Sequence, residues 1–209
     1  MARYTEAKCR LCRREGAKLF IKGARCITEK CPFVKRPNPP GIHTRMMRKP
    51  SYYSLQLREK QKVKRMYGML EKQFRRFFNL AESAKGVTGR NLIQLLESRL
   101  DNTVFRSLFA SSRNQARQIV LHGFIHLNGR KVNVPSCFLR EGDEILVKNK
   151  DGMRNVIKDN IASSAKDRSV PSWLEVDKDN LKIKVLRLPE KEDLVLPVNE
   201  QLIIELYSK

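Results

Sequence analysis

The fold of this chain is set by residues 99–145, which read RLDNTVFRSLFASSRNQARQIVLHGFIHLNGRKVNVPSCFLREGDEI. The stretch opens with a short predicted helix, because Val104, Phe105 and Leu108 recur at helical spacing. Asp101 stands where a side chain that caps such a helix is expected. The apolar stripe indicates that this helix packs against a neighbouring element.

A second helix follows at once. Ser112 and Gln115 have the spacing of a capping box, in which the serine accepts from a backbone N–H of the first turn and the glutamine reaches back. Arg113 and Arg117 lie one turn apart and are expected to point outward. Gly123 predicts the helix end, because glycine tolerates the left-handed conformation found there. The opposite, apolar face consists of Ala116, Ile119 and Val120.

A β-hairpin is predicted next. Ile125 and Leu127 alternate with polar residues up to Asn128-Gly129, the strongest short signal for a hairpin turn. The chain returns through Val132 and Val134, and a further turn at residues 141–143 leads into Ile145 and Val147. Residues 99–145 are therefore predicted to form a helix–helix–hairpin unit.

The charge of the chain points to a polyanionic partner. It holds 43 Lys and Arg against 22 Asp and Glu, a formal net charge of +21. Residues 1–90 contribute 24 of the basic and 6 of the acidic residues, so the excess lies in the N-terminal part. Nucleic acid is the leading candidate. An anionic membrane is disfavoured, because we find no long apolar run, signal peptide or lipidation motif, and the expected location is the cytoplasm.

Four cysteines near the N-terminus have metal-ligand spacing. Cys9 and Cys12 form one pair, and Cys26 and Cys31 form a second pair after a loop of thirteen residues. Two such pairs let four thiolates converge on one tetrahedral ion, so a closed structural zinc site is predicted. Nearby arginines are expected to keep the thiols ionised. An iron–sulfur cluster on the same four cysteines, a redox-active Cys9/Cys12 pair and unligated cysteines stay open as alternatives.

A basic segment follows the cysteines. Residues 32–50 are rich in proline and are expected to form an extended basic arm that follows phosphates, with a disordered linker as the alternative. From residue 51 to residue 67 a helix is predicted, and its basic run outnumbers the single Glu59. Phosphate contact by this run is favoured over a merely solvated face. The run consists of Arg58, Lys60, Lys62, Lys64 and Arg65.

The remaining elements are predicted from apolar spacing. A buried helical stripe is formed by Leu70, Phe74, Phe77, Phe78 and Ala81. A helix over residues 155–165 is expected to direct Val156, Ile157 and Ile161 inward. Strands are expected at 173–176 and 181–188. A closing helix after Pro197 is expected to return to the helix that carries Phe74 and Phe77.

The order of these motifs resembles a known RNA-binding module and the family that gave it its name. The resemblance is carried by Arg99-Leu100-Asp101, the Ser-Arg-x-x-Ala-Arg-Gln run ending at Gln118, His122-Gly123, Asn128-Gly129, Pro135-Ser136 and Gly142-Asp143. Outside the module it continues through Pro40-Gly41-x-His43, residues 57–62, Tyr67-Gly68, Glu71-x-Gln73-Phe74, Gly89 and residues 196–200. The chain resembles the bacterial family of ribosomal protein S-four, in its four-cysteine metal-binding variant. Leu108 stands where that family usually has glycine, and Phe124 and Ile42 also depart from its pattern.

The resemblance implies a function. It implies a structural constituent of the small ribosomal subunit that grips a multi-helix junction in the 5′ domain of the rRNA and nucleates assembly of the body. It also implies an interface with ribosomal protein S-five that affects translational accuracy, functional coupling to ribosomal protein S-twelve, and a place near the path by which mRNA enters. A second role as an mRNA-binding translational repressor stays open.

An RNA-modifying enzyme that carries the same module is the competing class. It would need a catalytic domain, and we find no Gly-rich dinucleotide turn, Walker loop or zinc-protease helix. His122 and His126 are four residues apart, but the helix is expected to end at Gly123 between them. Cys137 is interpreted as a small buried residue and not a nucleophile. The prediction is a non-enzyme with no small-molecule substrate.

The expected fold class is α+β. Residues 1–45 are expected to form the cysteine module and arm, residues 46–96 with 190–209 a helical domain, and residues 97–189 an RNA-binding domain of paired helices and antiparallel hairpins, with its core module at 97–150. The candidate RNA-binding residues are Arg3, Arg10, Arg13, Arg14, Lys35, Arg36, His43, Arg45, Arg58, Lys60, Gln61, Lys62, Lys64, Arg65, Tyr67, Arg113, Arg117, His122, Asn128, Arg130 and Lys131.

Overall fold

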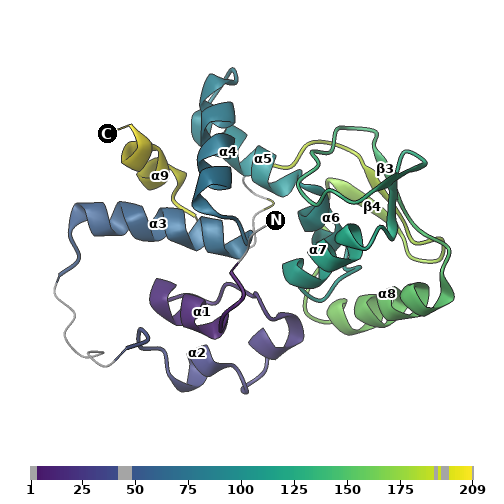
Figure 1. Ribbon diagram of the computed structural model, residues 1–209, viewed down its shortest axis with the longest axis horizontal. Coiled ribbons are helices and arrows are strands. Elements are labelled where there is room, and N and C mark those ends of the chain that lie inside the picture. Colours follow the sequence, from purple (N-terminus) through teal and green to yellow (C-terminus); the bar gives the residue numbers. More distant parts are fainter. Residues whose placement is uncertain (1–3, 42–48, 191–192, 194–197, 209) are drawn as a thin grey trace. The chain divides into compact units, whose positions relative to one another are not determined.

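The computed structural model describes residues 4–41, 49–190, 193 and 198–208 (Figure 1). The chain forms two compact units: unit 1 comprises Met1–Leu92 and Val195–Lys209, and unit 2 comprises Ile93–Leu194. The cysteine segment thus lies in the same unit as the helices that follow it. The predicted combination of helices and antiparallel strands is confirmed. None of the described helices has the length and apolar character needed to cross a bilayer.

Unit 1 is helical in its described part. Its helices are α1 (Cys9–Glu15), the 3-10 helix η1 (Gly23–Cys26), α2 (Pro32–Lys35), α3 (Tyr52–Met66), α4 (Glu71–Ser83) and α9 (Glu200–Tyr207), and α5 (Thr88–Glu97) runs from unit 1 into unit 2. The extended conformation expected from residue 32 is wrong at its start, where α2 forms. Pro32 begins this helix, at a position where its missing N–H removes no helical hydrogen bond.

The core of unit 1 is built by α3, α4 and α9. Ser51 caps α3, because its Oγ accepts from the backbone N–H of Ser54 at 3.2 Å. The predicted stripe on α4 is buried, except that Leu70 precedes the helix and is exposed. The ring of Tyr207 in α9 stacks on that of Phe78, with centroids 4.4 Å apart. The expected return of the C-terminal helix to α4 is therefore confirmed.

Gly89 is required by the close approach of α9 to the start of α5. A Cβ at this position would lie 2.4 Å from Cγ of Glu200 and 3.0 Å from its Cβ. We expect Gly89→Ala to destabilise the docking of α9, because overpacking of about 1–3 kcal/mol exceeds the gain of about 1 kcal/mol from replacing a helical glycine. Hydrogen exchange of the α9 amides should accelerate.

Gly152 in α8 (Asp151–Ser164) supplies the matched control. A Cβ there meets nothing within 4 Å, so Gly152→Ala should not destabilise the protein. Equal exchange rates for α9 in the Gly89→Ala variant and the wild type would contradict the requirement at residue 89.

Unit 2 begins with the two helices that the sequence predicts, α6 (Leu100–Arg106) and α7 (Arg113–Leu121). The expected capping by Asp101 is wrong, because Arg99 occupies the cap position and the carboxylate of Asp101 accepts from its guanidinium instead. The capping role of Ser112 is confirmed by the 3.3 Å bond from the N–H of Gln115 to its Oγ. The side chain of Gln115 reaches one residue further back than expected, to Ser111.

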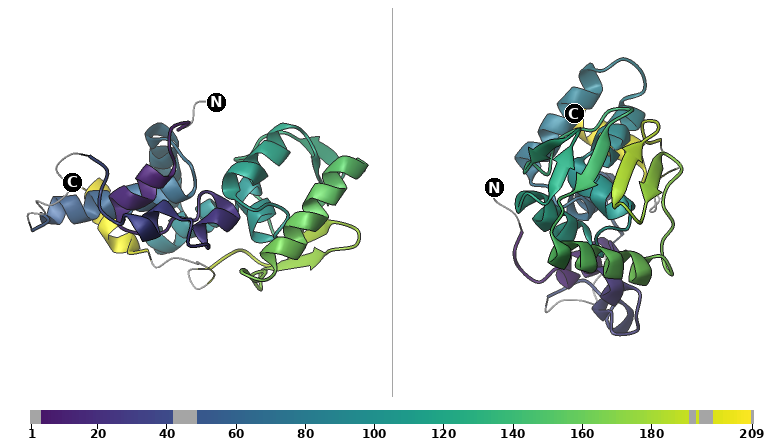
Figure 2. Two further views of the ribbon diagram at one scale, coloured as in Figure 1. Left: turned by 90° about the horizontal axis from the view of Figure 1, so that it is seen from below. Right: turned by 90° about the vertical axis from the view of Figure 1, so that its right-hand side faces the viewer.

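The sheet of unit 2 has five strands in the order β2-β1-β3-β5-β4, all antiparallel. The strands are β1 (Ile125–Leu127), β2 (Arg130–Val132), β3 (Glu144–Val147), β4 (Leu174–Asp177) and β5 (Lys182–Val185). The predicted turn between β1 and β2 is confirmed: Asn128 and Gly129 both have positive φ, of 48° and 78°. The right-hand view of Figure 2 shows the strands side by side, with α8 running across their lower ends in that view.

Helices α6, α7 and α8 bury one face of this sheet. The core contains the chain's single tryptophan, Trp173, which is fully buried together with Ile125, Ile145, Ile157 and Ile183. Helix α8 is longer than the predicted 155–165, and Val156 is exposed, contrary to expectation. Leu108 has a positive φ of 68°, a conformation that favours the glycine usual in the resembling family.

Candidate nucleic-acid interface

Every basic side chain of α3 is engaged by a carboxylate. Arg58 Nη1 lies 3.2 Å from Oε1 of Glu15 in α1, and Arg65 binds the same oxygen. Lys60 and Lys64 both donate to Glu71 in α4, the latter at 2.7 Å. Lys62 pairs with Glu59 on the same helix. The basic run predicted to contact phosphate is therefore also an internal network of ion pairs.

This network perturbs the titration of Glu71. Partial burial acts to raise the pKa of its carboxyl group, but the hydrogen bonds from Lys60 and Lys64 outweigh burial and lower the pKa to about 2. Tyr207 donates to the same carboxylate at 3.1 Å, and partial burial and the charge of Glu71 raise the pKa of this phenol. Glu71 thereby connects α3, α4 and α9.

The basic side chains of α3 still keep part of their surface. Lys62, Lys64, Arg58 and Arg65 are half-buried, whereas Lys60 is buried. Internal pairing does not exhaust a guanidinium, which has five donors in a fixed fork. Phosphate contact by α3 stays a prediction. The two other candidates of this segment, Gln61 and Tyr67, are half-buried and buried respectively.

The basic residues near the cysteines fall into two groups. Arg13 is tied to the proline-rich segment, since its Nε donates to the carbonyl of Asn38 at 2.8 Å and its Nη2 to that of Pro39 at 3.4 Å. The other described candidates of this segment are exposed: Arg10, Arg14, Lys35 and Arg36. The predicted sites Arg3, His43 and Arg45, and the family departure at Ile42, lie outside the described residues.

The outward orientation predicted for Arg117 is wrong. Arg117 is 8% exposed, and its Nη1 lies 3.5 Å from Oδ2 of Asp101. The same carboxylate accepts from Arg99 at 3.0 and 2.8 Å, and Arg99 is fully buried. Helical periodicity placed Arg117 opposite the apolar stripe, but it could not show that α6 covers that side of α7 as well. A direct RNA contact by Arg117 stays an untested prediction.

Arg113 is also held within unit 2. Its Nε donates to Oδ1 of Asn102 at 2.9 Å, and its guanidinium carbon lies 4.6 Å from the ring centre of Phe105. The guanidinium of Arg168 lies 4.3 Å from the same ring centre. Burial, followed by the charges of Arg113 and Arg106, lowers the pKa of Arg168 to about 10. The ring of Phe105 is thus a shared support for two arginines.

The exposed basic residues of the module lie at its hairpin. Arg130 and Lys131 in β2 are exposed, as is His122 after α7. Asn128 is exposed but its side chain holds the turn, because Nδ2 donates to Asp143 at 2.8 Å and Oδ1 accepts from the N–H of Glu144 at 2.9 Å. His122, Arg130 and Lys131 are therefore predicted contacts of the module that the fold leaves exposed.

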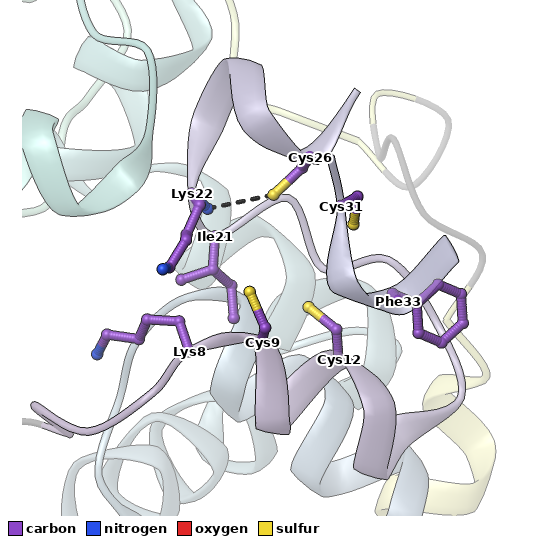
Figure 3. A pocket seen from close by; sticks show the side chains of 8 residues that line it. All are labelled: Lys8, Cys9, Cys12, Ile21, Lys22, Cys26, Cys31 and Phe33. Atoms are coloured by element: carbon purple, nitrogen blue, oxygen red, sulfur yellow. Dashed lines mark hydrogen bonds between the residues drawn. The ribbon is translucent and has the colours of Figure 1, made fainter. Parts of the chain in front are cut away.

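The four N-terminal cysteines line one pocket (Figure 3). The sulfurs of Cys9 and Cys12 on α1 point toward the side where Cys26 and Cys31 lie. Three of the four residues are buried, and only Cys9 is half-buried. The backbone N–H of Lys22 donates to the sulfur of Cys26 at 3.4 Å. Among the described residues, no group of three or more His, Cys, Asp and Glu side chains is arranged to hold a metal ion.

Ionisation of these thiols by neighbouring arginines stays a prediction, and burial opposes it at two of them. Burial raises the pKa of Cys12 and of Cys26 above the usual thiol range, and the neighbouring sulfurs act in the same direction. The donor set nevertheless suits a soft metal ion, because four thiols from two closely spaced pairs share one small pocket.

Sequence reasoning missed the acidic half of the interface. Glu15, Glu71 and Glu97 each bind two or more partners, but the basic residues that they bind lie on other helices and seven or more residues away. Arg168 was missed as well, since it follows α8 and reaches Phe105 only through the tertiary fold. No local pattern marks such partners.

Comparisons with known proteins agree over the whole chain. Residues 3–97 match the family model "Ribosomal protein S4/S9 N-terminal domain", and residues 98–145 match "S4 domain". The chain is 56% identical to "Small ribosomal subunit protein uS4" of Solidesulfovibrio magneticus over 209 residues, with full coverage of both chains. Proteins of the same name from Maridesulfovibrio salexigens and Thermoanaerobacter are 58% and 54% identical, again with full coverage.

Proposed function

The chain belongs to the uS4 family of small ribosomal subunit proteins, and on that premise we propose that it is a primary binder of small-subunit rRNA. It is a structural component of the ribosome that binds rRNA, and it is not an enzyme. It acts within the cytoplasmic ribosome. The single observation that carries the finer proposal is the concentration of basic residues in the first 90 positions, with α3 at their centre.

In this proposal unit 1 and the module of unit 2 each contribute a basic surface. Unit 1 offers the partly exposed arginines of α3 and the exposed basic residues around α1 and α2, and unit 2 offers Arg130 and Lys131. Two such surfaces suit a junction of RNA helices, where phosphates of more than one strand lie close together. We infer that the protein grips such a junction in the 5′ domain and nucleates assembly of the body.

The proposal extends to neighbouring components of the ribosome. It includes an interface with ribosomal protein S-five that affects translational accuracy, functional coupling to ribosomal protein S-twelve, and a place near the path by which mRNA enters. A repressor role on an mRNA would use the same basic surfaces, so it is compatible with the same residues. The support for this paragraph is family membership alone.

Sedimentation tests the proposal. The tagged protein should co-sediment with small ribosomal subunits at one copy per subunit and stay bound in high salt, as a structural constituent does. Outside the assembled subunit, purified protein should bind isolated small-subunit rRNA with an affinity that falls as salt is raised, because neutralising each phosphate releases counterions. Release of the protein by a high-salt wash would indicate a transient binder and contradict the proposal.

We further propose that Cys9, Cys12, Cys26 and Cys31 hold one structural zinc ion, with an iron–sulfur cluster as the alternative on the same residues. The pocket that they share supports this, as does the small core of this segment: among the described residues its buried cluster consists of Cys12, Leu19 and Ile21, with Leu11 and Phe33 packed against it. When bound, the metal would supply a cross-link between α1 and the segment from η1 to α2. It would perform no catalysis.

Metal analysis of the full-length protein tests this site. Protein purified anaerobically should carry one metal ion or cluster, and Cys9→Ser with Cys12→Ser should abolish it. A colourless holo form indicates zinc, whereas broad visible absorption indicates a cluster. Order should be lost in the segment that contains α1, η1 and α2, while unit 2 stays folded around its own core. Unchanged order without any metal would contradict the proposal.

A further inference from the structure

Glu15 joins α1, which carries two of the cysteines, to the basic helix α3. Its side chain is 0% exposed, and its Oε1 accepts from Arg58 at 3.2 Å and from Arg65. Its second oxygen, Oε2, is buried and has no hydrogen-bond partner in the described part of the chain. A single oxygen atom therefore anchors two guanidinium groups.

Stability alone accounts poorly for this arrangement. Burying a carboxylate costs free energy. An ion pair offsets this cost only when its geometry is good and the remaining lone pairs of the carboxylate also accept hydrogen bonds. Here one oxygen is left unsatisfied, which adds a further penalty. Burial also raises the pKa of Glu15 in spite of the two arginines. A costly buried group that is retained beside a binding surface is a candidate for a functional role.

The geometry of the two arginines indicates what that role is. Arg58 and Arg65 are seven residues, or about two helical turns, apart, so their side chains project from the same side of α3. Their side chains are 33% and 23% exposed, so each keeps an edge in solvent while its inner edge binds Glu15. Without the carboxylate, two cations held this close would repel each other and spread apart.

We propose that Glu15 is a positioning residue that holds Arg58 and Arg65 as one clamp for a phosphate group of rRNA, and that it links this clamp to the cysteine module formed by α1, η1 and α2. This inference rests on the proposed rRNA-binding function. The fork of a guanidinium binds phosphate through two parallel N–H donors, and fixing two forks in advance removes the entropy cost of ordering them on binding. Glu71 gives a contrast, because its side chain is 47% exposed and it orders lysines, which have no fork.

Neutralising Glu15 distinguishes positioning from simple repulsion of RNA. Loss of any acidic residue makes the protein more basic, so Glu29→Gln, an exposed position between Cys26 and Cys31, should leave rRNA affinity unchanged or raise it slightly. Glu15→Gln should do the opposite and lower the affinity of full-length protein for small-subunit rRNA about tenfold, the equivalent of one lost charge-assisted hydrogen bond. Its binding should also become less salt-sensitive, because fewer phosphates are neutralised.

A variant that lacks both arginines provides the decisive test of this positioning role. In an Arg58→Gln/Arg65→Gln variant, Glu15→Gln should cause no further loss, because there is no clamp left to position. Additive losses would show that Glu15 acts elsewhere and would overturn the proposal. Higher affinity of Glu15→Gln in the wild-type background would overturn it too, since the carboxylate would then compete with RNA.

A version of the test leaves Glu15 intact, in case its substitution prevents folding. If the two arginines act as one clamp, Arg58→Gln and Arg65→Gln should each lower affinity nearly as much as the double variant. Independent, additive losses would overturn the clamp. Failure of the underlying function looks different: the wild-type protein itself would not bind small-subunit rRNA. A double arginine variant that binds as well as the wild type would overturn the clamp alone.

Discussion

Glu97→Ala is expected to destabilise unit 2 by about 3–5 kcal/mol, because it leaves a buried arginine without its counter-charge. Glu97 is 0% exposed, and its two carboxylate oxygens accept from Nε and Nη2 of Arg106, both at 2.8 Å. Asn102 donates to the same carboxylate at 2.8 Å and to the carbonyl of Glu97 at 2.9 Å. The substitution therefore removes both carboxylate acceptors of the Arg106 guanidinium, while Asn102 keeps its bond to the carbonyl of residue 97.

Urea unfolding followed by the fluorescence of Trp173 measures this effect. Trp173 is the chain's single tryptophan and is fully buried in unit 2, so its signal reports that unit. Glu144→Ala is the control, because it removes a partly exposed ion pair with Lys182 and should shift the midpoint little. Similar shifts for the two variants would mean that Glu97 and Arg106 are more hydrated than their burial indicates.

The elements that could be predicted from the sequence are those fixed by local signals. The Asn128-Gly129 turn, the cap at Ser112 and the stripe of α4 depend on residues a few positions apart, and all three are confirmed. The departure at Leu108 is a related case. At this position the family that the chain resembles usually has glycine, and φ is positive here although the residue is leucine.

What could not be predicted depends on partners distant in the sequence. Arg117 was expected to face solvent because its own helix gives it a polar side, but Asp101 of α6 covers it. Glu15 and Arg58 are 43 residues apart, and no periodicity relates them. The local charge pattern therefore predicts the basic run of α3 but not the carboxylates that form ion pairs with it. The candidate surface was predicted as a set of free cations, whereas the structure shows a network with internal anions.

Phe105 carries the second large effect. Its ring is 5% exposed in the core of unit 2 and lies beneath the guanidinium groups of Arg113 and Arg168. We expect Phe105→Ala to cost about 3–5 kcal/mol, because it removes a buried aromatic side chain and leaves a cavity. It would also remove the negative face of the ring, which attracts both guanidinium groups.

Phe105→Leu separates the aromatic contribution from simple burial. Leucine keeps much of the apolar volume but has no π face, so the loss beyond repacking should be about 0.5–2 kcal/mol for each guanidinium contact. The matched control is Phe109→Leu, a fully buried residue of the same core with no guanidinium over its ring in the described part of the chain. Trp173 fluorescence in urea should show a larger loss for Phe105→Leu than for Phe109→Leu. Equal losses would mean that the guanidinium of Arg113 points into solvent, as its position on the helix alone predicts. Its contact with the ring would then contribute nothing to stability.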